Sequence, residues 1–232
     1  MCGVIGYLAP NVTLKDLDNL TTLLEESQVR GRHSTGVSYI LEGEIKTVIE
    51  KDCASVFISR RMREINADLW REGSIRLIGH TRYATSGETP QPIHLHDISL
   101  AMNGVISQAD PSTWGHGYTT DNDAEILQRE LLCGGHAFQR DFENASIAAC
   151  ALYHDGRLLA FRNGRRPLWR AQLRAETVVF SSTAQILARA LDPCGAVELI
   201  KPGTVYRYWR DIDQLKAQYI VRSREMEDLQ CA

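Results

Sequence analysis

The sequence predicts an α+β fold in which layered β-sheets carry helices on their outer faces. Short alternating or apolar runs, typical of strands, fall into two blocks, and runs with helical spacing lie between and after these blocks. No stretch rich in Pro, Gly or Ser separates the two blocks. We therefore expect one domain over residues 1–210, followed by a polar tail, residues 211–232, that docks a partner.

The first block predicts five strands and two helices. The strands are expected near 2–9, 36–41, 44–50, 75–82 and 97–103. Residues 41–45 are expected to form the hairpin turn between the second and third of them. The helices are expected at 14–27, where leucines recur with helical spacing, and at 54–70. A third helix is expected at 122–133, with Asp121 or Asn122 as its cap.

The second block is richer in strands. They are expected near 146–153, 157–162, 167–173, 176–181, 196–200 and 204–209. Asp155-Gly156 is a hairpin signal between the first two of these strands. A helix is expected at 183–191, so that both blocks have helices available to cover a sheet.

Composition indicates an ordinary globular protein. Of its 232 residues, 44% are hydrophobic and 24% charged, and the net charge of −3 shows no regional excess. This balance argues against nucleic acid or an anionic membrane as the main partner. The N-terminus lacks a secretory pattern, and the six cysteines include no C-x-x-C pair, so we expect a reduced, cytoplasmic protein.

The sequence Met1-Cys2-Gly3 is chemically unusual, because methionine aminopeptidases remove a Met that precedes a residue as small as Cys. Cys2 would then carry both a thiol and a free α-amine. That amine, with an ordinary pKa of about 8, would take the thiol proton directly or through a water and so activate a nucleophile. The alternative is that Cys2 is a small side chain packed at the start of the first strand.

Four polar segments could complete a site around this thiol. They are residues 30–36, 79–87, 102–104 and 120–125. Arg82 offers a planar fork that matches a carboxylate, and Asp123 could hold an ammonium group. Asn103 beside the backbone N–H of Gly104 supplies the two donors of an oxyanion hole. Together these groups suit an α-amino acid with an acyl group at its far end.

Each residue also has a plainer interpretation when taken singly. Arg82 could be a surface ion-pair partner at a strand end, and Asn103-Gly104 is a common hairpin turn signal. Asp123 could be only a helix cap. The order and spacing of the segments, rather than any one of them, favour the functional interpretation.

These segments resemble the class II glutamine amidotransferase domain of the N-terminal-nucleophile (Ntn) hydrolase superfamily. The family patterns are M-C-G-[IV]-x-G, R-G-x-[DE]-S-x-G, G-H-x-R-[YW]-[AS]-T, N-G and D-x-E. They correspond to residues 1–6, 30–36, 79–85, 103–104 and 123–125. Weaker likenesses at 163–168, 179–182 and 200–203 extend the resemblance to about residue 210.

The resemblance implies a four-layer αββα sandwich and hydrolysis of the side-chain amide of L-glutamine without a metal or other cofactor. Cys2 would be the nucleophile, and Asn103 and Gly104 would stabilise the oxyanion. Substrate binding would fall to Arg82, Thr85, Ser86 and Asp123, with Arg30 supporting the N-terminal residue.

Three positions depart from the family pattern. His33 stands where an acid is usual, Met102 where a His commonly precedes N-G, and Ser182-Thr183 replaces Ser-Glu. The sequence given also stops where the family's synthase domain would begin. The expectation is therefore a stand-alone glutaminase that delivers ammonia to a separate acceptor subunit.

Three alternatives stay open. The chain could be a glutamine-sensing regulatory subunit without turnover, or an N-terminal-Cys hydrolase acting on another amide. A metal site at His94, His96 and His116 is the third, although no Cys or carboxylate is spaced to complete it. His80 is expected to be a hydrogen-bonded structural histidine rather than a proton shuttle.

Overall fold

The protein is described here by a computed structural model of residues 1–232. It describes the chain except for residues 85–86, 115–116, 133–144, 192–194 and 209–232. The whole of the tail predicted to dock a partner, and the substrate-binding candidates Thr85 and Ser86, therefore lie outside the described residues.

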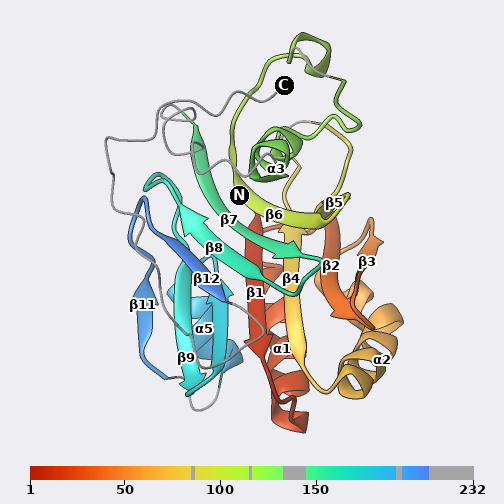
Figure 1. Ribbon diagram of the computed structural model, residues 1–232, viewed down its shortest axis with the longest axis vertical. Coiled ribbons are helices and arrows are strands. Elements are labelled where there is room, and N and C mark those ends of the chain that lie inside the picture. Colours follow the sequence, from red (N-terminus) through yellow and green to blue (C-terminus); the bar gives the residue numbers. More distant parts are fainter. Residues whose placement is uncertain (85–86, 115–116, 133–144, 192–194, 209–232) are drawn as a thin grey trace.

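The larger of two β-sheets has seven strands in the order β11-β9-β10-β1-β4-β2-β3, and every neighbouring pair is antiparallel (Figure 1). Its strands are β1 (Gly3–Ala9), β2 (Ser34–Leu41), β3 (Glu44–Glu50), β4 (Ile75–Arg82), β9 (Trp169–Arg174), β10 (Thr177–Ser181) and β11 (Val197–Leu199). The strand that follows Cys2 therefore lies in the middle of the sheet, between β10 and β4.

The smaller sheet has five strands in the order β12-β8-β7-β6-β5, again all antiparallel. Its strands are β5 (Ile93–Leu95), β6 (Ile98–Val105), β7 (Ser146–Tyr153), β8 (Leu158–Arg162) and β12 (Val205–Tyr208). The described helices are α1 (Leu14–Ser27), α2 (Ala54–Glu72), α3 (Ala124–Leu132) and α5 (Ala184–Ala190), with a 3₁₀ turn, η1, at Pro111–Thr113.

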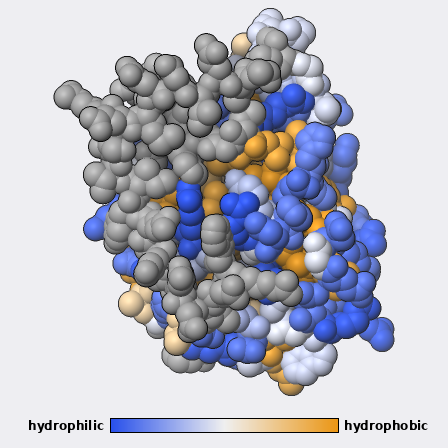
Figure 2. Space-filling view, in the orientation of Figure 1, coloured by the Kyte–Doolittle hydropathy of each residue, from blue (hydrophilic) through white to orange (hydrophobic). Residues whose placement is uncertain are grey.

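The two sheets and the helices form four layers. Helices α1, α2 and α5 pack on the seven-stranded sheet, and α3 packs on β5 and β6 of the five-stranded sheet (Figure 1). The predicted αββα sandwich is thereby confirmed. In the view of Figure 2 the described surface on the right is mostly hydrophilic, and hydrophobic side chains show beside the segments drawn in grey.

Alternation along β1 explains why this strand is buried on both faces. Val4 and Leu8 point into a core between the two sheets, whereas Ile5 and Tyr7 point into a second core beneath α1 and α2. All seven residues of β1 are buried. A strand buried on both faces must be apolar throughout, and this requirement accounts for the sequence Gly-Val-Ile-Gly-Tyr-Leu-Ala.

Local signals place α1 on the seven-stranded sheet. The Thr13 side chain accepts a hydrogen bond from the Asp16 backbone N–H, and the Asp16 carboxylate accepts one from the Thr13 backbone N–H, which forms a capping box. Asp16 also accepts hydrogen bonds from the Tyr7 hydroxyl (3.0 Å) and from Arg174 (2.7 Å). The cap is thereby joined to two strands of the sheet beneath it.

The structure corrects the sequence prediction at two places. Strand β5 was not predicted, because three residues are too few to show alternation. Strand β6 continues to Val105, so Asn103-Gly104 lies within a strand, paired with Ala148 and Ile147, and is not a turn. The plainer interpretation of Asn103-Gly104 as a hairpin signal is therefore wrong.

One further observation concerns the helices as a group. Among the residues that the structure describes, none of the helices combines the length and the apolar content needed to cross a lipid bilayer.

Candidate active site

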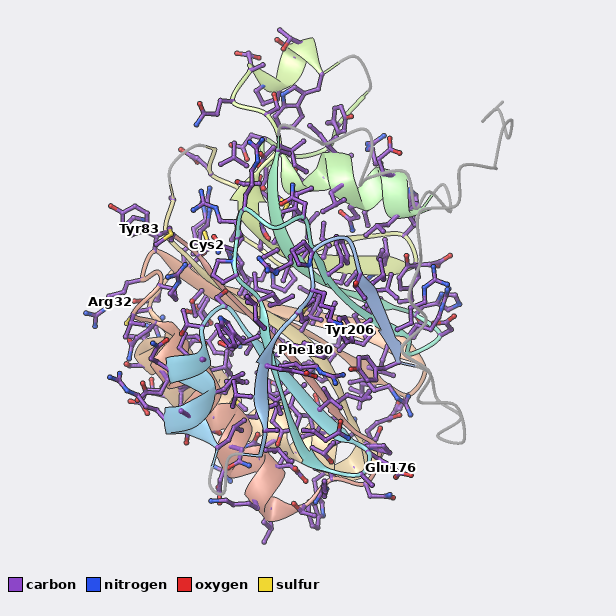
Figure 3. The ribbon with its side chains drawn as sticks, turned by 90° about the vertical axis from the view of Figure 1, so that its left-hand side faces the viewer. Cys2, Arg32, Tyr83, Glu176, Phe180 and Tyr206 are labelled. Carbon is purple, nitrogen blue, oxygen red and sulfur yellow. The ribbon has the colours of Figure 1, made fainter. Side chains whose placement is uncertain are left out.

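Cys2 lies directly before β1, at the end of the central strand where β4 finishes with Arg82. Its half-buried thiol contacts the backbone of Tyr83: the Tyr83 N–H donates to Sγ at 3.4 Å, and Sγ donates to the Tyr83 carbonyl at 3.6 Å. Figure 3 shows Cys2 and Tyr83 together at one edge of the molecule, with Arg32 below them. The thiol is thus both held in place and partly open to solvent.

Asn103 brings the second sheet to the thiol. Its side chain is buried, and its Oδ1 accepts a hydrogen bond from the backbone N–H of Cys2 at 3.2 Å. Within the described part of the chain its Nδ2 has no hydrogen-bond partner, although it is buried. A buried donor without an acceptor is costly in a folded protein. Beside a nucleophile, it is the donor that a developing oxyanion requires.

Gly104 is constrained by close contact with β7. A Cβ at this position would lie 1.8 Å from the Ser146 carbonyl oxygen, so that only glycine fits. Its strand partner Ile147 bonds through its own N–H and C=O to Asn163 on the other side of β7. In an antiparallel ladder this makes Gly104–Ile147 a pair without mutual hydrogen bonds, so the Gly104 N–H points away from β7. It is thereby available as a second oxyanion donor.

The close contact at Gly104 yields a stability prediction. Gly104→Ala should destabilise the fold by about 1–3 kcal/mol, as overpacking does, because a strand carbonyl would have to move. The thermal unfolding midpoint should then fall by about 2–10 °C. Gly117→Ala is the control, since a Cβ there meets nothing within 4 Å, and it should leave the midpoint unchanged. Equal midpoints for the two variants would show that the strands separate easily at Gly104.

His80, next to the oxyanion residues, is a buried neutral histidine. Its Nε2 lies 3.1 Å from the Met102 carbonyl oxygen, and burial lowers the pKa of His80 to about 3. The neutral ring therefore donates from Nε2 and anchors the residue that precedes Asn103. The prediction of a hydrogen-bonded structural histidine is confirmed.

Arg82 is buried beside the site, and its guanidinium holds the loop that follows β4. It donates to the carbonyl of Gly87 at 2.7 Å and to that of Glu88 at 3.2 Å. A substrate carboxylate would have to replace carbonyl acceptors such as these. Arg82 thus organises the loop, which its sequence position did not indicate.

Asp123 connects the start of α3 to the strand that carries Asn103. Its carboxylate accepts hydrogen bonds from the N–H groups of Ile106 (2.6 Å) and Ser107 (3.1 Å), just beyond β6. Burial raises the pKa of this carboxyl above its ordinary value, and the two N–H groups oppose the shift. Asn122 acts as a cap at the start of α3, because its Oδ1 accepts a hydrogen bond from the Ala124 N–H at 3.1 Å.

Arg30 contacts both N-terminal residues. Its Nε donates to the Cys2 carbonyl at 3.4 Å, and its Nη2 contacts the Met1 sulfur at 3.6 Å. Desolvation by burial lowers the pKa of Arg30, and the neighbouring Cys2 opposes this shift. Arg166 reaches the same Met1 sulfur at 3.4 Å from the turn after β8.

Several neighbours of the site were missed by sequence reasoning. Gln91 joins two parts of the site, since its Oε1 accepts from Met102 N–H (2.6 Å) and its Nε2 donates to Asn122 (3.3 Å). Asp121 accepts from the Thr89 N–H at 2.8 Å. No spacing could have revealed these contacts, because they join residues that only the fold brings together. They anchor Thr89 and Gln91 in the segment that follows β4.

Two of the three histidines of the alternative metal site, His94 and His96, lie within the described residues. His94 lies in β5, and its Nε2 contacts the His96 carbonyl at 2.9 Å, whereas His96 has a positive φ of 51° outside the strand. His116 lies outside the described residues. Within the described chain no group of three or more His, Cys, Asp and Glu side chains could hold a metal ion.

The four layers, with the strand after Cys2 in the middle of the larger sheet, form the αββα sandwich that solved amidotransferases share. Among solved structures, glutamine phosphoribosylpyrophosphate amidotransferase from B. subtilis matches 89% of this chain and 47% of its own, with a TM-score of 0.64 and 19% identity. An allosteric regulatory enzyme of purine biosynthesis matches 89% of this chain and 46% of its own, with a TM-score of 0.66 and 17% identity. At such identities the likeness establishes the fold.

Sequence relatives point to particular enzymes. The chain is 32% identical over 148 residues to glutamine–fructose-6-phosphate aminotransferase of Pyrococcus horikoshii, which covers 64% of this chain and 22% of the relative. It is 29% identical over 189 residues to amidophosphoribosyltransferase of the same organism, with coverage of 72% and 39%. No protein-family model matches the chain. These relatives confirm the predicted resemblance to the class II glutamine amidotransferases, and the chain spans well under half of their length.

Proposed function

We propose that this chain is a glutaminase in which Cys2 hydrolyses the side-chain amide of L-glutamine. The observation that carries the proposal is the contact between Cys2 and Asn103, whose Nδ2 is buried and unpaired within the described chain. Hydrolysis of an amide by a thiol needs three groups: the thiol itself, an adjacent nitrogen that acts as base, and a hydrogen-bond donor for the oxyanion. Similarity to glutamine-dependent amidotransferases supports glutamine as the substrate.

The proposed mechanism begins with removal of Met1. The Cys2 nitrogen, here a peptide N–H bonded to Asn103 Oδ1, then becomes the α-amine, and the same oxygen orients it. The amine takes the thiol proton, and the thiolate attacks the amide carbon of glutamine. Negative charge develops on the amide oxygen, where Asn103 Nδ2 and the Gly104 N–H would stabilise it.

The second half of the reaction returns the proton. The protonated amine donates it to the departing nitrogen, the C–N bond breaks, and ammonia leaves a γ-glutamyl thioester on Cys2. Water then attacks the thioester, with the amine as base, and the C–S bond breaks to give glutamate and free thiol. Arg82 and Asp123 would hold the α-carboxylate and α-ammonium of the substrate, and Thr85 and Ser86 belong to the same proposed binding loop.

The test combines product analysis with covalent labelling. Purified protein should have lost the mass of one Met and should release glutamate and ammonia from glutamine. A diazo ketone analogue of glutamine should label Cys2 once, and excess glutamine should protect it. Labelling of Cys53, a free half-buried thiol at the start of α2, would contradict the proposal.

The same assay tests the two remaining alternatives, the glutamine sensor and the hydrolase for another amide. A glutamine sensor would be stabilised against heat by glutamine and would form no glutamate. An N-terminal-Cys hydrolase for another amide would act on substrates that lack the α-amino acid group. The presence of both Arg82 and Asp123, which suit a free α-amino acid, argues against the hydrolase for another amide.

We extend the proposal to the ammonia, which would pass to an acceptor site on a separate subunit. Free ammonia becomes ammonium at neutral pH and is then no nucleophile, so release into solvent would waste it. Residues 211–232 are assigned to docking this subunit. Co-purification of a synthase-like chain that raises glutaminase turnover would support this, and unchanged activation of a chain truncated after Arg210 would exclude the tail from docking.

A further inference from the structure

His33 makes three contacts with three consecutive residues at the start of the loop after β4. Its backbone N–H donates to the Arg82 carbonyl at 2.9 Å, and its ring stacks on the Tyr83 ring with centroids 5.2 Å apart and planes inclined by 26°. Its Nδ1 accepts a hydrogen bond from the Ala84 N–H at 2.9 Å. An Nδ1 that accepts carries no proton, so the ring proton of the neutral form sits on Nε2.

The segment that His33 holds is also the segment that contacts the thiol. The Tyr83 N–H and carbonyl lie on either side of Cys2 Sγ, at 3.4 and 3.6 Å. Arg82, one residue earlier, extends its guanidinium to Gly87 and Glu88 in the same loop. Any shift of residues 82–84 would therefore move the neighbour of the nucleophile and the proposed carboxylate-binding group together.

The chain beside His33 leaves this segment little freedom on one side. A Cβ at Gly31 would lie 2.2 Å from the Arg82 carbonyl carbon and 2.4 Å from the Tyr83 nitrogen, so the two backbones are in direct contact there. The far side is open, because both the His33 residue and the Tyr83 ring are exposed to solvent. The side chain of His33 thus joins the exposed part of the loop to the rigid contact at Gly31.

We propose that His33 is a positioning residue that holds Tyr83 and Ala84 in register with the Cys2 thiol, by stacking on Tyr83 and accepting from the Ala84 N–H. This rests on the proposed glutaminase function, and it assigns to His33 the placement of residues 82–84 beside the thiol. His33 itself does not touch the thiol. Its two contacts are separable: the hydrogen bond fixes the backbone of Ala84, and the stacking fixes the ring of Tyr83.

Three substitutions separate these contacts. His33→Asn retains an acceptor at nearly the same place as Nδ1 and removes most of the ring. His33→Phe retains the ring and removes the acceptor, and His33→Ala removes both. His154→Asn is the control, because this exposed histidine lies in the β7–β8 hairpin, away from the loop.

The first readout is independent of activity. Hydrogen exchange of the Ala84 amide, followed by NMR, should be about 5-fold or more faster in His33→Ala and His33→Phe than in wild type, which is the effect of losing one neutral hydrogen bond. It should be close to wild type in His33→Asn and in the control. Equal exchange in all five proteins would overturn the proposed anchoring.

The second readout connects the anchor to the site. In His33→Ala, KM for glutamine should rise about 5- to 10-fold with a smaller fall in kcat, and alkylation of Cys2 by iodoacetamide should change in rate. A purely structural role would lower the unfolding midpoint and leave KM and alkylation unchanged in the folded protein. That result would overturn the positioning role.

The combined outcomes distinguish the two proposals. Faster Ala84 exchange and altered alkylation in a protein that never hydrolyses glutamine would refute the glutaminase function and preserve the role of His33 at the thiol. Normal glutaminase activity that is insensitive to all three substitutions would refute the role of His33 alone. A double-mutant cycle with Tyr83→Ala should show that the ring contacts are coupled, and strict additivity would exclude stacking.

Discussion

Cys2→Ser should lower kcat for glutamine hydrolysis by about 10⁴-fold or more, since loss of a catalytic nucleophile has among the largest effects of any substitution. A serine hydroxyl keeps the geometry, but with the same α-amine as base it is far less ionised than a thiol. Glutamate release from saturating glutamine, measured by coupled assay, gives the comparison. Intact mass should show that Met1 is still removed, so that the loss reflects chemistry and not processing.

Two other cysteines provide matched controls for this substitution. Cys53 is free and half-buried at the start of α2, and Cys53→Ser should leave turnover unchanged. Cys150 is free and fully buried between the sheets, and burial raises the pKa of its thiol, so it should resist labelling in the folded protein. A Cys2→Ser variant with near-normal kcat would refute the proposed mechanism.

Arg82→Lys should lower kcat/KM for glutamine by about 30- to 150-fold, or about 2–3 kcal/mol, which is the cost of losing a charged bidentate contact. A lysine ammonium is a point charge and cannot reproduce the planar fork. Arg61→Lys is the control, because this exposed arginine forms a surface ion pair with Glu50 and its replacement should be neutral. Steady-state kinetics over a range of glutamine concentrations checks the prediction.

Arg82 also donates to Gly87 and Glu88, so a loss of activity could come from the loop rather than from the substrate carboxylate. A second substrate distinguishes the two causes. An analogue of glutamine that lacks the α-carboxylate, 4-aminobutanamide, tests the carboxylate contact directly. If Arg82 binds the carboxylate, wild type should strongly prefer glutamine and Arg82→Lys should lose most of that preference. An equal loss on both substrates would mean that Arg82 acts only by organising the loop.

Much of the fold was predictable because its elements are long and strongly patterned. Strand β1 and helix α1 were expected at 2–9 and 14–27 and are observed at Gly3–Ala9 and Leu14–Ser27. In both, side-chain periodicity is clear, and a capping box marks the start of α1. Strand β5 was missed because it depends on pairing with β6, and no pattern within three residues expresses that pairing.

The sequence predicted which residues belong to the candidate site, but only part of how these residues are arranged in space. Asn103 was expected at a strand end and instead lies within β6, where the two sheets bring it to Cys2 over a separation of 101 residues. The roles of Gln91 and His33 appear only in three dimensions. Their partners are backbone groups, and any residue type presents a backbone N–H or carbonyl, so the sequence of the partner carries no signal.

The sequence by itself determined the nucleophile candidate, the layered α+β architecture and the family resemblance. These depend on local chemistry: a small thiol after Met1, side-chain periodicity, and short motifs of fixed spacing. Only the tertiary structure decided that the Asn103 amide nitrogen is buried, with no partner among the described residues, that Arg82 also holds its own loop, and that His33 contacts Tyr83. Those facts arise because close packing of two sheets brings distant backbone and side-chain groups into contact, at distances that sequence separation does not encode.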